Sequence, residues 1–500
     1  MTDTVSINRS SSRISELLWH LGPPAVFILV MLIFFPFLHR FQFDADEGFN
    51  LMKALLLNHD YSLYSQVWND QPPFFTYLLA GVIRLFGLNV DATRILVLIL
   101  SAGLIWGAVQ FLRITWGPWP ALVVPFLLML LPYFPELSVS VMIGLPAIVL
   151  AMLSLAGLAF WHQRHQERWL VFSALALSLS VMTKLFTGFL APVFIIGILV
   201  DQYFTWRGAL TWRKLLRPAL IWGLVFGGLT AALALIFVGL PNLLDLIVPH
   251  ITASERLANR KIFTRFDLIY YLQRAQTILI LAGLGGLMAL VTRRWISFYL
   301  VAWVVGAYVL LSHNTPVWYH HQLLVTIPAA VLAAAAVGEA IQTFQSFFRT
   351  DIFLHIRIAL SVIIFVSFAY VLREHFMSTV ELFSPQPVFT YLTQPDVKTK
   401  DPILLQMKQT AAQSPWIVTD EPMYAFRAGM LVPPNLVVFS QKRLESGQLP
   451  IPEILDTLRA YKPELVLLGR FGLPELDKYL GQHYQIIIED SDEQLYRLNN

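Results

Sequence analysis

The chain has 500 residues, of which 56% are hydrophobic and only 13% are charged, and its formal net charge is +3. A soluble protein of this length needs a more highly charged surface, so the composition excludes an ordinary globular domain. The small net charge gives no reason to expect a nucleic-acid partner, and the absence of cysteine excludes disulfides and thiolate metal ligands. We therefore expect a polytopic α-helical membrane protein.

The first 20 residues are rich in serine and carry Arg9 and Arg13. This composition predicts a disordered cytosolic tail over residues 1–20. The apolar run at 22–39 is not followed by a small-residue cleavage pattern, so we interpret it as an uncleaved anchor. A membrane domain is expected over residues 21–375.

Eleven hydrophobic runs approach the length of a bilayer crossing. They lie at 22–39, 93–112, 118–133, 141–160, 169–184, 186–203, 218–240, 276–292, 296–312, 322–341 and 357–373. Basic connections fall at every second gap, at 162–168, 207–217, 293–294 and 349–357, which predicts that these connections face the cytosol. A shorter apolar run at 74–88 is expected to lie in the outer leaflet. The predicted topology is about eleven crossings of the cytoplasmic (plasma) membrane, with the N-terminus cytosolic.

The pattern changes after residue 375 to short apolar strands and amphipathic helices. Strands are predicted at 416–419, 465–468 and 485–488, and helices at 452–459 and 474–480. Residues 376–500 are therefore expected to form a small α/β domain, which the predicted topology places outside the membrane.

Acidic residues gather in the predicted outer loop, residues 40–73. Asp44, Asp46 and Glu47 follow the first apolar run, and Asp70 precedes the next one. Carboxylates held at a membrane surface are costly to desolvate, and they can accept a proton from a hydroxyl or hold a cation. For Asp44 and Asp70, solvated loop charges are an equal alternative, whereas apolar flanks predict partial burial of the Asp46–Glu47 pair.

Basic residues in two other regions are candidates for an anion site. Arg256 and Arg260, one helical turn apart, lie in the predicted outer loop 241–275, where the usual charge bias would not place them. They are predicted to bind an anion such as a phosphate, and the alternative is a surface helix resting on anionic headgroups. Lys184 lies between two apolar runs, so it either snorkels to the interface or faces a cavity.

The loop at 312–321 carries three imidazoles. The adjacent His320 and His321 would point apart in a helix, so a joint metal site is not expected. One of them is predicted to contact a phosphate or sugar, and an aromatic interface belt is the alternative for Trp318 and Tyr319. Nucleotide-binding loops and zinc-helix motifs do not occur in the sequence.

Several of these motifs together resemble the GT-C class of membrane glycosyltransferases. The likeness is to the protein O-mannosyltransferase and lipid A aminoarabinose transferase superfamily, and it covers residues 20–340. It rests on Asp46-Glu47, Gln71-Pro72-Pro73, Phe86-Gly87 followed by Arg94, Lys184, and the loop 313–321. One departure is at 139–146, where relatives often carry an acidic residue and this chain has Glu136 as its nearest acid.

The resemblance implies a GT-C-like fold and a sugar donor carried on a polyprenyl phosphate. It also implies transfer to an acceptor hydroxyl at the outer face, with Asp46 as the catalytic carboxylate. The acceptor would be a protein, a lipid or a glycan, membrane lipids would be further partners, and the sugar would be a hexose or pentose, as in a mannosyltransferase.

The resulting hypothesis is an inverting displacement at the anomeric carbon. Asp46 is the expected general base, and Glu47 is expected to orient Asp46 or bind a sugar hydroxyl. The expected donor-phosphate ligands are Lys184, Arg256, Arg260, His320 and His321, and the expected substrate-binding residues are Asp44, Asp70, Gln71 and Tyr319. No metal ligand is assigned, and a divalent cation is left open as a cofactor.

Two other functions compete with this hypothesis. A flippase or transporter of lipid-linked sugars requires ionisable residues along the helix interiors, which most of the long runs lack. A non-catalytic membrane sensor would leave the acidic cluster unexplained.

Overall fold

The computed structural model describes residues 9–206, 211–257, 265–345, 354–383, 401–490 and 493–499. Its α-helices are α1 (Arg9–Phe34), α2 (Ala45–Asn58), α3 (Phe74–Phe86), α4 (Val90–Thr115), α5 (Pro118–Met129), α6 (Phe134–Leu137), α7 (Gly144–Arg164), α8 (Glu167–Val181), α9 (Leu190–Thr205), α10 (Trp212–Phe237), α11 (Val248–Leu257), α12 (Arg265–Gln273), α13 (Gln276–Val291), α14 (Phe298–Ser312), α15 (Leu323–Gln345) and α16 (Leu354–Leu382). The C-terminal region adds α18 (Pro402–Ala411), α19 (Pro422–Ala428), α20 (Gln441–Glu445), α21 (Ile451–Tyr461) and α22 (Pro474–His483). Short 3₁₀ turns are η1 (Phe37–His39), η2 (Leu185–Phe189), η3 (Leu240–Leu246), η5 (Trp295–Ser297) and η6 (Tyr319–Gln322).

Each of the eleven hydrophobic runs forms a helix in the described part of the chain. Eight of the described helices are long and apolar enough to cross a membrane alone, and α12 with α13 would make a ninth span bent by 82°. The remaining two, α5 and α8, have only 12 and 15 residues. The membrane-protein fold is thus confirmed. The helices differ more in length than the hydrophobic runs in the sequence do.

Helix α15 is the most buried of the described spans. Small residues allow its neighbours to approach closely, as is common between membrane helices. A Cβ atom on Gly338 would lie 2.5 Å from Pro120 of α5, and one on Gly285 of α13 would lie 2.6 Å from the carbonyl of Leu332. The bundle therefore packs around α15, with α5, α13, α14 and α16 against it.

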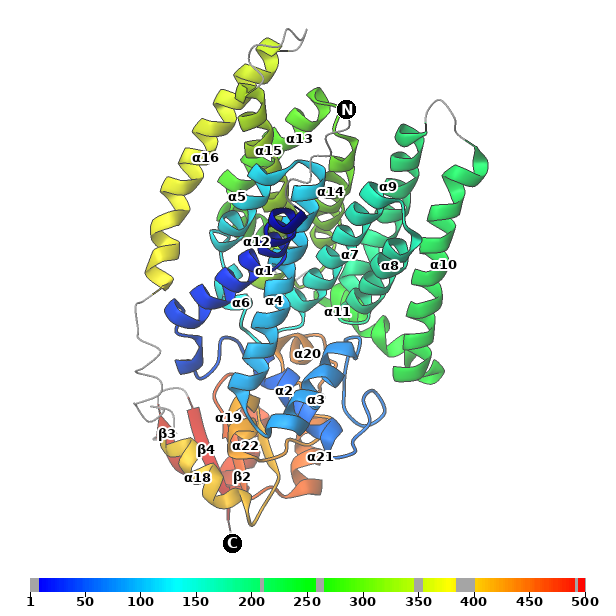
Figure 1. The fold of residues 1–500 in the computed structure, drawn as a ribbon. Coiled ribbons are helices and arrows are strands. Elements are labelled where there is room, and N and C mark those ends of the chain that lie inside the picture. Colours follow the sequence, from blue (N-terminus) through cyan, green and yellow to red (C-terminus); the bar gives the residue numbers. More distant parts are fainter. Residues whose placement is uncertain are drawn as a thin grey trace, which may run out of the picture.

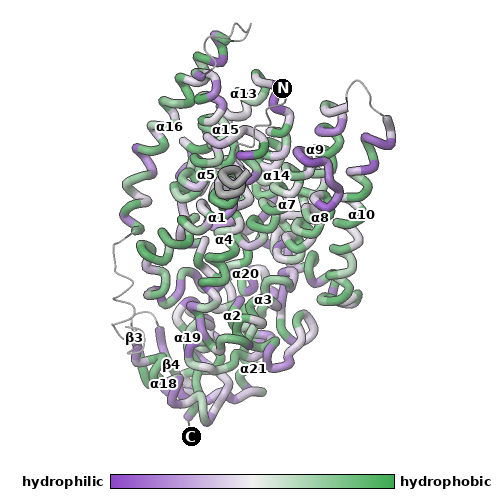
Figure 2. The backbone as a smooth tube through the Cα atoms, viewed as in Figure 1, coloured by the Kyte–Doolittle hydropathy of each residue, from purple (hydrophilic) through white to green (hydrophobic). Residues whose placement is uncertain are grey.

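The two ends of the bundle differ. One end of the bundle contains the start of α16, the end of α9 and the start of α10 (Figure 1). The C-terminal domain covers the other end. Helices α2 and α3 also lie at the C-terminal domain's end, between it and the bundle (Figure 1). Hydrophobic residues dominate the bundle, whereas hydrophilic ones are mixed into the C-terminal region (Figure 2).

The C-terminal domain contains a four-stranded sheet in the order β1-β2-β4-β3. Strands β1 (Ile417–Thr419) and β2 (Leu465–Leu468) are parallel, and β4 (Glu493–Leu498) is antiparallel to both β2 and β3 (Tyr484–Asp490). Three of these strands and helices α21 and α22 correspond to predicted elements. Strand β4 was not predicted, because its polar sequence lacks the apolar run on which the other strands were identified.

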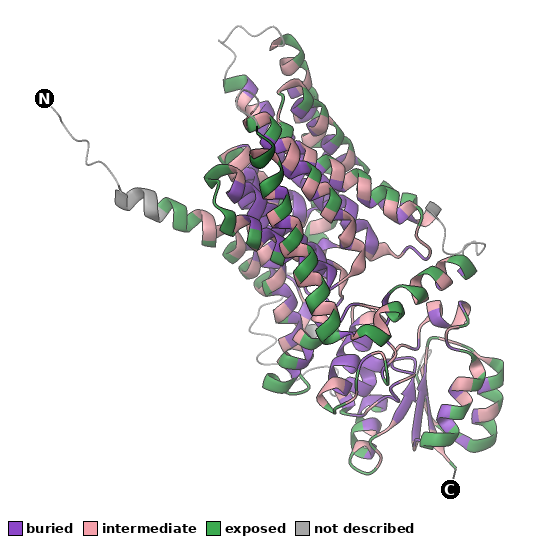
Figure 3. Ribbon diagram, turned by 90° about the vertical axis from the view of Figure 1, so that its right-hand side faces the viewer, coloured by how far each residue is buried: buried purple, intermediate pink, exposed green. Residues whose placement is uncertain are grey.

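The C-terminal domain shares one hydrophobic core with α2 and α3. Leu51 and Leu55 of α2 belong to the same buried cluster as Met423 and Phe426 of α19. A Cβ atom on Gly48 would lie 2.6 Å from the backbone nitrogen of Met423, so only glycine lets the two helices come this close. Buried residues continue from the bundle into this domain (Figure 3). The domain is therefore fixed against the loop 40–73, which contains the acidic cluster.

Candidate active site

A cavity of about 250 Å³ lies between the end of the bundle and the C-terminal domain. Eight residues predicted for the site line it: Asp44, Asp46, Asp70, Gln71, Lys184, Tyr319, His320 and His321. Its walls come from α2, the loop after it, the start of η2, α11, the loop before α15, and the C-terminal segments near 440 and 470. Segments far apart in the sequence thus converge on one space.

Asp46 lies in the first turn of α2, on the face that borders the cavity. Asp44 caps this helix by accepting a hydrogen bond from the backbone nitrogen of Asp46 at 3.0 Å. Phe49, Asn50 and Lys53 line the cavity too, and their spacing of three, four and seven residues from Asp46 places all four on one helix face. The Asp46 carboxylate accepts no hydrogen bond from another described residue. It is therefore available to a ligand.

Burial and the neighbouring charge of Asp44 raise the pKa of Asp46 to about 6. Lys184, Lys53 and Arg470 oppose this shift. A carboxylate with this pKa is ionised at neutral pH and still basic enough to accept a proton.

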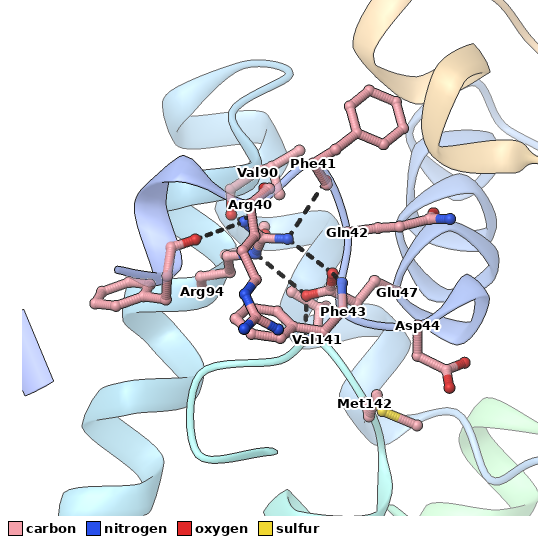
Figure 4. Close-up of polar contacts among 12 residues, drawn as sticks. Arg40, Phe41, Gln42, Phe43, Asp44, Glu47, Val90, Arg94, Val141 and Met142 are labelled. Carbon is pink, nitrogen blue, oxygen red and sulfur yellow. Dashed lines mark hydrogen bonds and ion pairs between the residues drawn. The ribbon is translucent and has the colours of Figure 1, made fainter. Parts of the chain in front are cut away.

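Glu47 has different surroundings and does not line the cavity. Its side chain is fully buried against that of Arg94, with Oε2 at 2.8 Å from Nη2 and Oε1 at 3.2 Å from Nε. Backbone nitrogens of Phe43 and Val141 also donate to the two oxygens, at 2.8 and 3.0 Å. Figure 4 shows this network beside the turn that leads into α2. Arg94 and two amides occupy both oxygens, so this arrangement favours the expectation that Glu47 orients Asp46 over the alternative that it binds a sugar hydroxyl.

Arg94 ties the network to the preceding loop as well. Its Nη1 donates to the carbonyls of Phe37 and Arg40 at 2.9 and 2.7 Å. Asn50 completes the framework by donating to the carbonyl of Val141 at 3.0 Å. Val141, in the segment 139–146, is thus used here to hold α2.

Lys184 and His320 form the part of the cavity best suited to an anion. The Lys184 ammonium makes no ion pair with another described residue and lies 5.3 Å from the ring centroid of Phe186. Nδ1 of His320 is buried without a hydrogen-bond partner. Both side chains border Gly144, where an added Cβ would lie 3.8 Å from Lys184 Nζ and 4.0 Å from His320 Cδ2. The Lys184 ammonium and the His320 ring therefore border the same space.

His321 was expected to point away from His320, but both rings line the cavity. Their centroids are 4.5 Å apart and the rings are edge to face. Within a single 3₁₀ turn at a cavity wall, adjacent side chains can border one space without pointing the same way. The ring of His321 accepts a hydrogen bond from the backbone nitrogen of Trp318 at 3.2 Å, which fixes it.

Asp70 lines the cavity as part of a cross-link between three segments. Nζ of Lys442 lies 2.7 Å from Asp70 Oδ2, and Nε2 of His250 lies 2.8 Å from the Asp70 carbonyl oxygen. Gln71 donates to the other Asp70 carboxylate oxygen at 3.1 Å. Burial alone would raise the pKa of Asp70, but Lys442 and His250 hold it well below its usual range. Asp70 is therefore an anchor for the C-terminal domain.

The remaining predicted residues lie in different places. Tyr319 donates to Asp44 Oδ2 at 3.2 Å. Arg256 donates to the carbonyl of Ser446 in the C-terminal domain and does not line the cavity. Arg260 lies outside the described residues.

Four ionisable residues that line the cavity were missed by the sequence analysis: Lys53, His250, Lys442 and Arg470. Lys53, which donates to Asn69 Oδ1 at 3.2 Å, could have been found from its helical spacing to Asp46. Arg470 donates to the carbonyl of Asp420 and lies over the ring of Phe49. Neither it nor Lys442 has a local signal, because tertiary packing alone brings the C-terminal domain over α2. Among the described residues, no cluster of three or more acidic or imidazole side chains is arranged to hold a metal ion.

The comparisons with known proteins concern both sequence and fold. Residues 70–238 match the family model described as dolichyl-phosphate-mannose-protein mannosyltransferase. None of the curated protein sequences matches this chain. The crystal structure of ArnT from Cupriavidus metallidurans bound to undecaprenyl phosphate is 14% identical, with a TM-score of 0.61, and the match covers 97% of this chain and 98% of that one.

Two structures from Archaeoglobus fulgidus are also similar. The apo oligosaccharyltransferase is 11% identical, with a TM-score of 0.53, and the match covers 90% of this chain and 69% of that one. The oligosaccharyltransferase AglB in complex with an inhibitory peptide and a dolichol-phosphate is 10% identical, with a TM-score of 0.52 and coverage of 91% and 70%. These likenesses show a shared fold that extends over nearly the whole chain.

Proposed function

We propose that this chain is a glycosyltransferase of the GT-C superfamily, which the family match and the shared fold support, and that it transfers a monosaccharide from a polyprenyl-phosphate donor to an acceptor hydroxyl. One observation carries the proposal. In a single cavity at the end of a membrane bundle, the free carboxylate of Asp46 lies together with the unpaired ammonium of Lys184 and the unsatisfied imidazole of His320.

The reaction assigned to this geometry is a direct displacement. Asp46 accepts the proton of the acceptor hydroxyl, and that oxygen forms a bond to the anomeric carbon of the sugar. The bond from this carbon to the phosphate oxygen breaks, and its electron pair leaves with the polyprenyl phosphate. Attack from the side opposite the leaving group inverts the configuration of the anomeric carbon.

Lys184 and His320 stabilise the departing phosphate. Negative charge grows on the leaving oxygen as the bond breaks, and preorganised donors in a partly dry site stabilise that charge more than water does. Arg470 adds a positive charge to the cavity and His321 adds a ring N–H donor, while Asp44 and Tyr319 are placed to contact the sugar or the acceptor.

A lipid-linked donor also accounts for the position of the cavity. Its isoprenoid tail would remain in hydrocarbon while the phosphate and sugar reach the end of the bundle. The similar structures of ArnT and AglB contain undecaprenyl phosphate and a dolichol-phosphate, respectively. The family description favours a mannose-like sugar, and the acceptor would be a protein, a lipid or a glycan.

We place the cavity and the C-terminal domain on the outer side of the cytoplasmic membrane, with the N-terminus in the cytosol. The basic connections support this orientation, because basic connections usually face the cytosol. The connections at 207–217 and 349–357 adjoin helices at the side of the bundle farther from the C-terminal domain (Figure 1).

The test is transfer by Asp46→Asn in proteoliposomes supplied with an undecaprenyl-phosphate-linked sugar. We expect at least about a 100-fold loss of rate, because Asn cannot accept the proton. Asp456→Asn, at an exposed residue of α21 far from the cavity, is the matched control and should retain full activity. Unchanged transfer by Asp46→Asn would reject the assignment, and a product that retains the donor's anomeric configuration would reject direct displacement.

A further inference from the structure

A second cavity, of about 400 Å³, lies at the end of the bundle opposite the C-terminal domain, and the proposed reaction does not use it. It lies between the last turns of α4, α7 and α9 and the connection from α13 to α14. Like the first cavity, it combines an acidic residue with basic ones.

Asp201 of α9 forms the acidic wall of this second cavity. Its Oδ1 lies 2.5 Å from Nδ1 of His162, whereas its Oδ2 is buried without a hydrogen-bond partner. The residue is only 8% exposed. A buried carboxylate oxygen without a donor is costly, so this atom marks a place where a ligand can supply one.

The wall beside Asp201 is held by close packing. A Cβ atom on Gly197, one turn earlier in α9, would lie only 2.0 Å from the Cε1 atom of Tyr299. The ring of Tyr299 therefore lies directly on the backbone of α9. No larger residue fits at Gly197 unless the Tyr299 ring moves.

Two adjacent arginines form the basic side, and only one of them is paired. Nε of Arg294 lies 2.8 Å from Oε1 of the buried Glu339. The side chain of Arg293 is exposed and makes no hydrogen bond or ion pair with another described residue. Its backbone is left-handed, with a φ of 55°, a conformation that costs a non-glycine residue about 1 kcal/mol or more. One guanidinium is thus structural, and the other is presented at the rim.

Aromatic residues place this rim at the level of a membrane surface. The ring of Phe204 stacks on that of Trp295 with centroids 4.3 Å apart and an angle of 4°. Trp295 is 44% exposed, as is typical of indole rings at the boundary between hydrocarbon and headgroups. A ligand of this cavity therefore reaches it from the lipid headgroup layer.

We propose that this cavity binds a membrane phospholipid whose headgroup joins a phosphate to a primary ammonium, as in phosphatidylethanolamine. The phosphate pairs with the Arg293 guanidinium, and the ammonium donates a hydrogen bond to Oδ2 of Asp201. A trimethylated ammonium has no N–H to donate, and a glycerol headgroup brings no cation to the carboxylate. The site therefore selects by hydrogen bonding as well as by charge.

The test uses the full-length protein in detergent, mixed with equal amounts of phosphatidylethanolamine, phosphatidylcholine and phosphatidylglycerol. Retained lipid is measured by native mass spectrometry. We expect phosphatidylethanolamine to be retained about tenfold more strongly than phosphatidylcholine, because one hydrogen bond to a charged group is worth about that factor. Equal retention of the two lipids would overturn the proposal.

Two variants and one control assign the preference to this cavity. Asp201→Asn should lose most of the preference for the ethanolamine lipid because the carboxylate charge is gone, and Arg293→Gln, at an exposed position, should retain less of all three lipids. Arg217→Gln breaks the exposed Arg217–Glu167 pair at the same end of the bundle and should keep the preference. An unchanged preference in Asp201→Asn, or displacement of the lipid by an equal concentration of soluble phosphoethanolamine, would contradict the assignment.

Discussion

The two faces of α2 carry adjacent carboxylates in very different surroundings. On the cavity face, Asp46 accepts no hydrogen bond from a described residue and lies near the cations Lys184 and Arg470. On the neighbouring face, Glu47 is fully buried and bonded to Arg94 and two backbone nitrogens. The comparison indicates that the two adjacent carboxylates have different roles. Glu47 fixes the helix, and the rigidly held Asp46 keeps its charge available for chemistry.

The largest expected effect is on stability, and it differs between substitutions on the two faces of α2. Glu47→Gln leaves the Arg94 guanidinium buried without its counter-charge, and we expect it to lower the free energy of unfolding by about 3–5 kcal/mol. Asp46→Asn removes a poorly solvated charge that has no partner, so it should leave stability unchanged or increase it. Thermal unfolding in detergent measures both.

The neighbouring Arg40–Glu136 pair is the control for that experiment. Its side chains are 44% and 26% exposed, and exposed ion pairs contribute about 0–1 kcal/mol. Glu136→Gln should therefore change the melting temperature far less than Glu47→Gln. If Glu47→Gln melts like the wild type while losing transfer, Glu47 acts in the chemistry, and the division between the two faces fails.

A second prediction tests whether Asp46 works with a cation across the cavity. Lys184→Gln removes the unpaired ammonium, and we expect about a 100-fold fall in the transfer rate because charge stabilisation at the leaving phosphate is lost. Binding can be measured separately from transfer, as the affinity of the protein for polyprenyl phosphate. This affinity should also fall. A variant that binds the lipid normally and transfers at the wild-type rate would exclude this role.

Much of the membrane fold could be predicted from the sequence, because bilayer thickness sets the length of an apolar helix and every long run became one. Asp46 and Lys184 were also identified, since a charge beside an apolar run stands out. The pairing of Glu47 with Arg94 left no such signal, because the two residues are 47 positions apart and their contact depends on the packing of α2 against α4. The C-terminal contributors were missed for the same reason.

A third prediction concerns how the C-terminal domain holds the cavity closed. Lys442→Gln leaves Asp70 with His250 and Gln71 but without its ammonium partner. We expect about a tenfold loss of transfer, the equivalent of one hydrogen bond to a charged group, with a small fall in melting temperature. Lys462→Gln, in the same domain but away from the cavity, is the matched control. Equal activity of the two variants would show that the Asp70 cross-link is not needed for the site.

The smallest expected effect is a shift in pH dependence that reports the environment of Asp46 directly. The active form is the carboxylate, so transfer should fall about tenfold per pH unit below about pH 6, where the raised pKa of Asp46 protonates it. Asp44 contributes to that raised pKa, and Asn caps a helix as well as Asp does. Asp44→Asn should therefore preserve α2 while moving the acid limb to lower pH, because the neighbouring negative charge is gone. An acid limb that stays in place or moves to higher pH would mean that another group controls the reaction, and the free carboxylate on the cavity face would lose its assigned role.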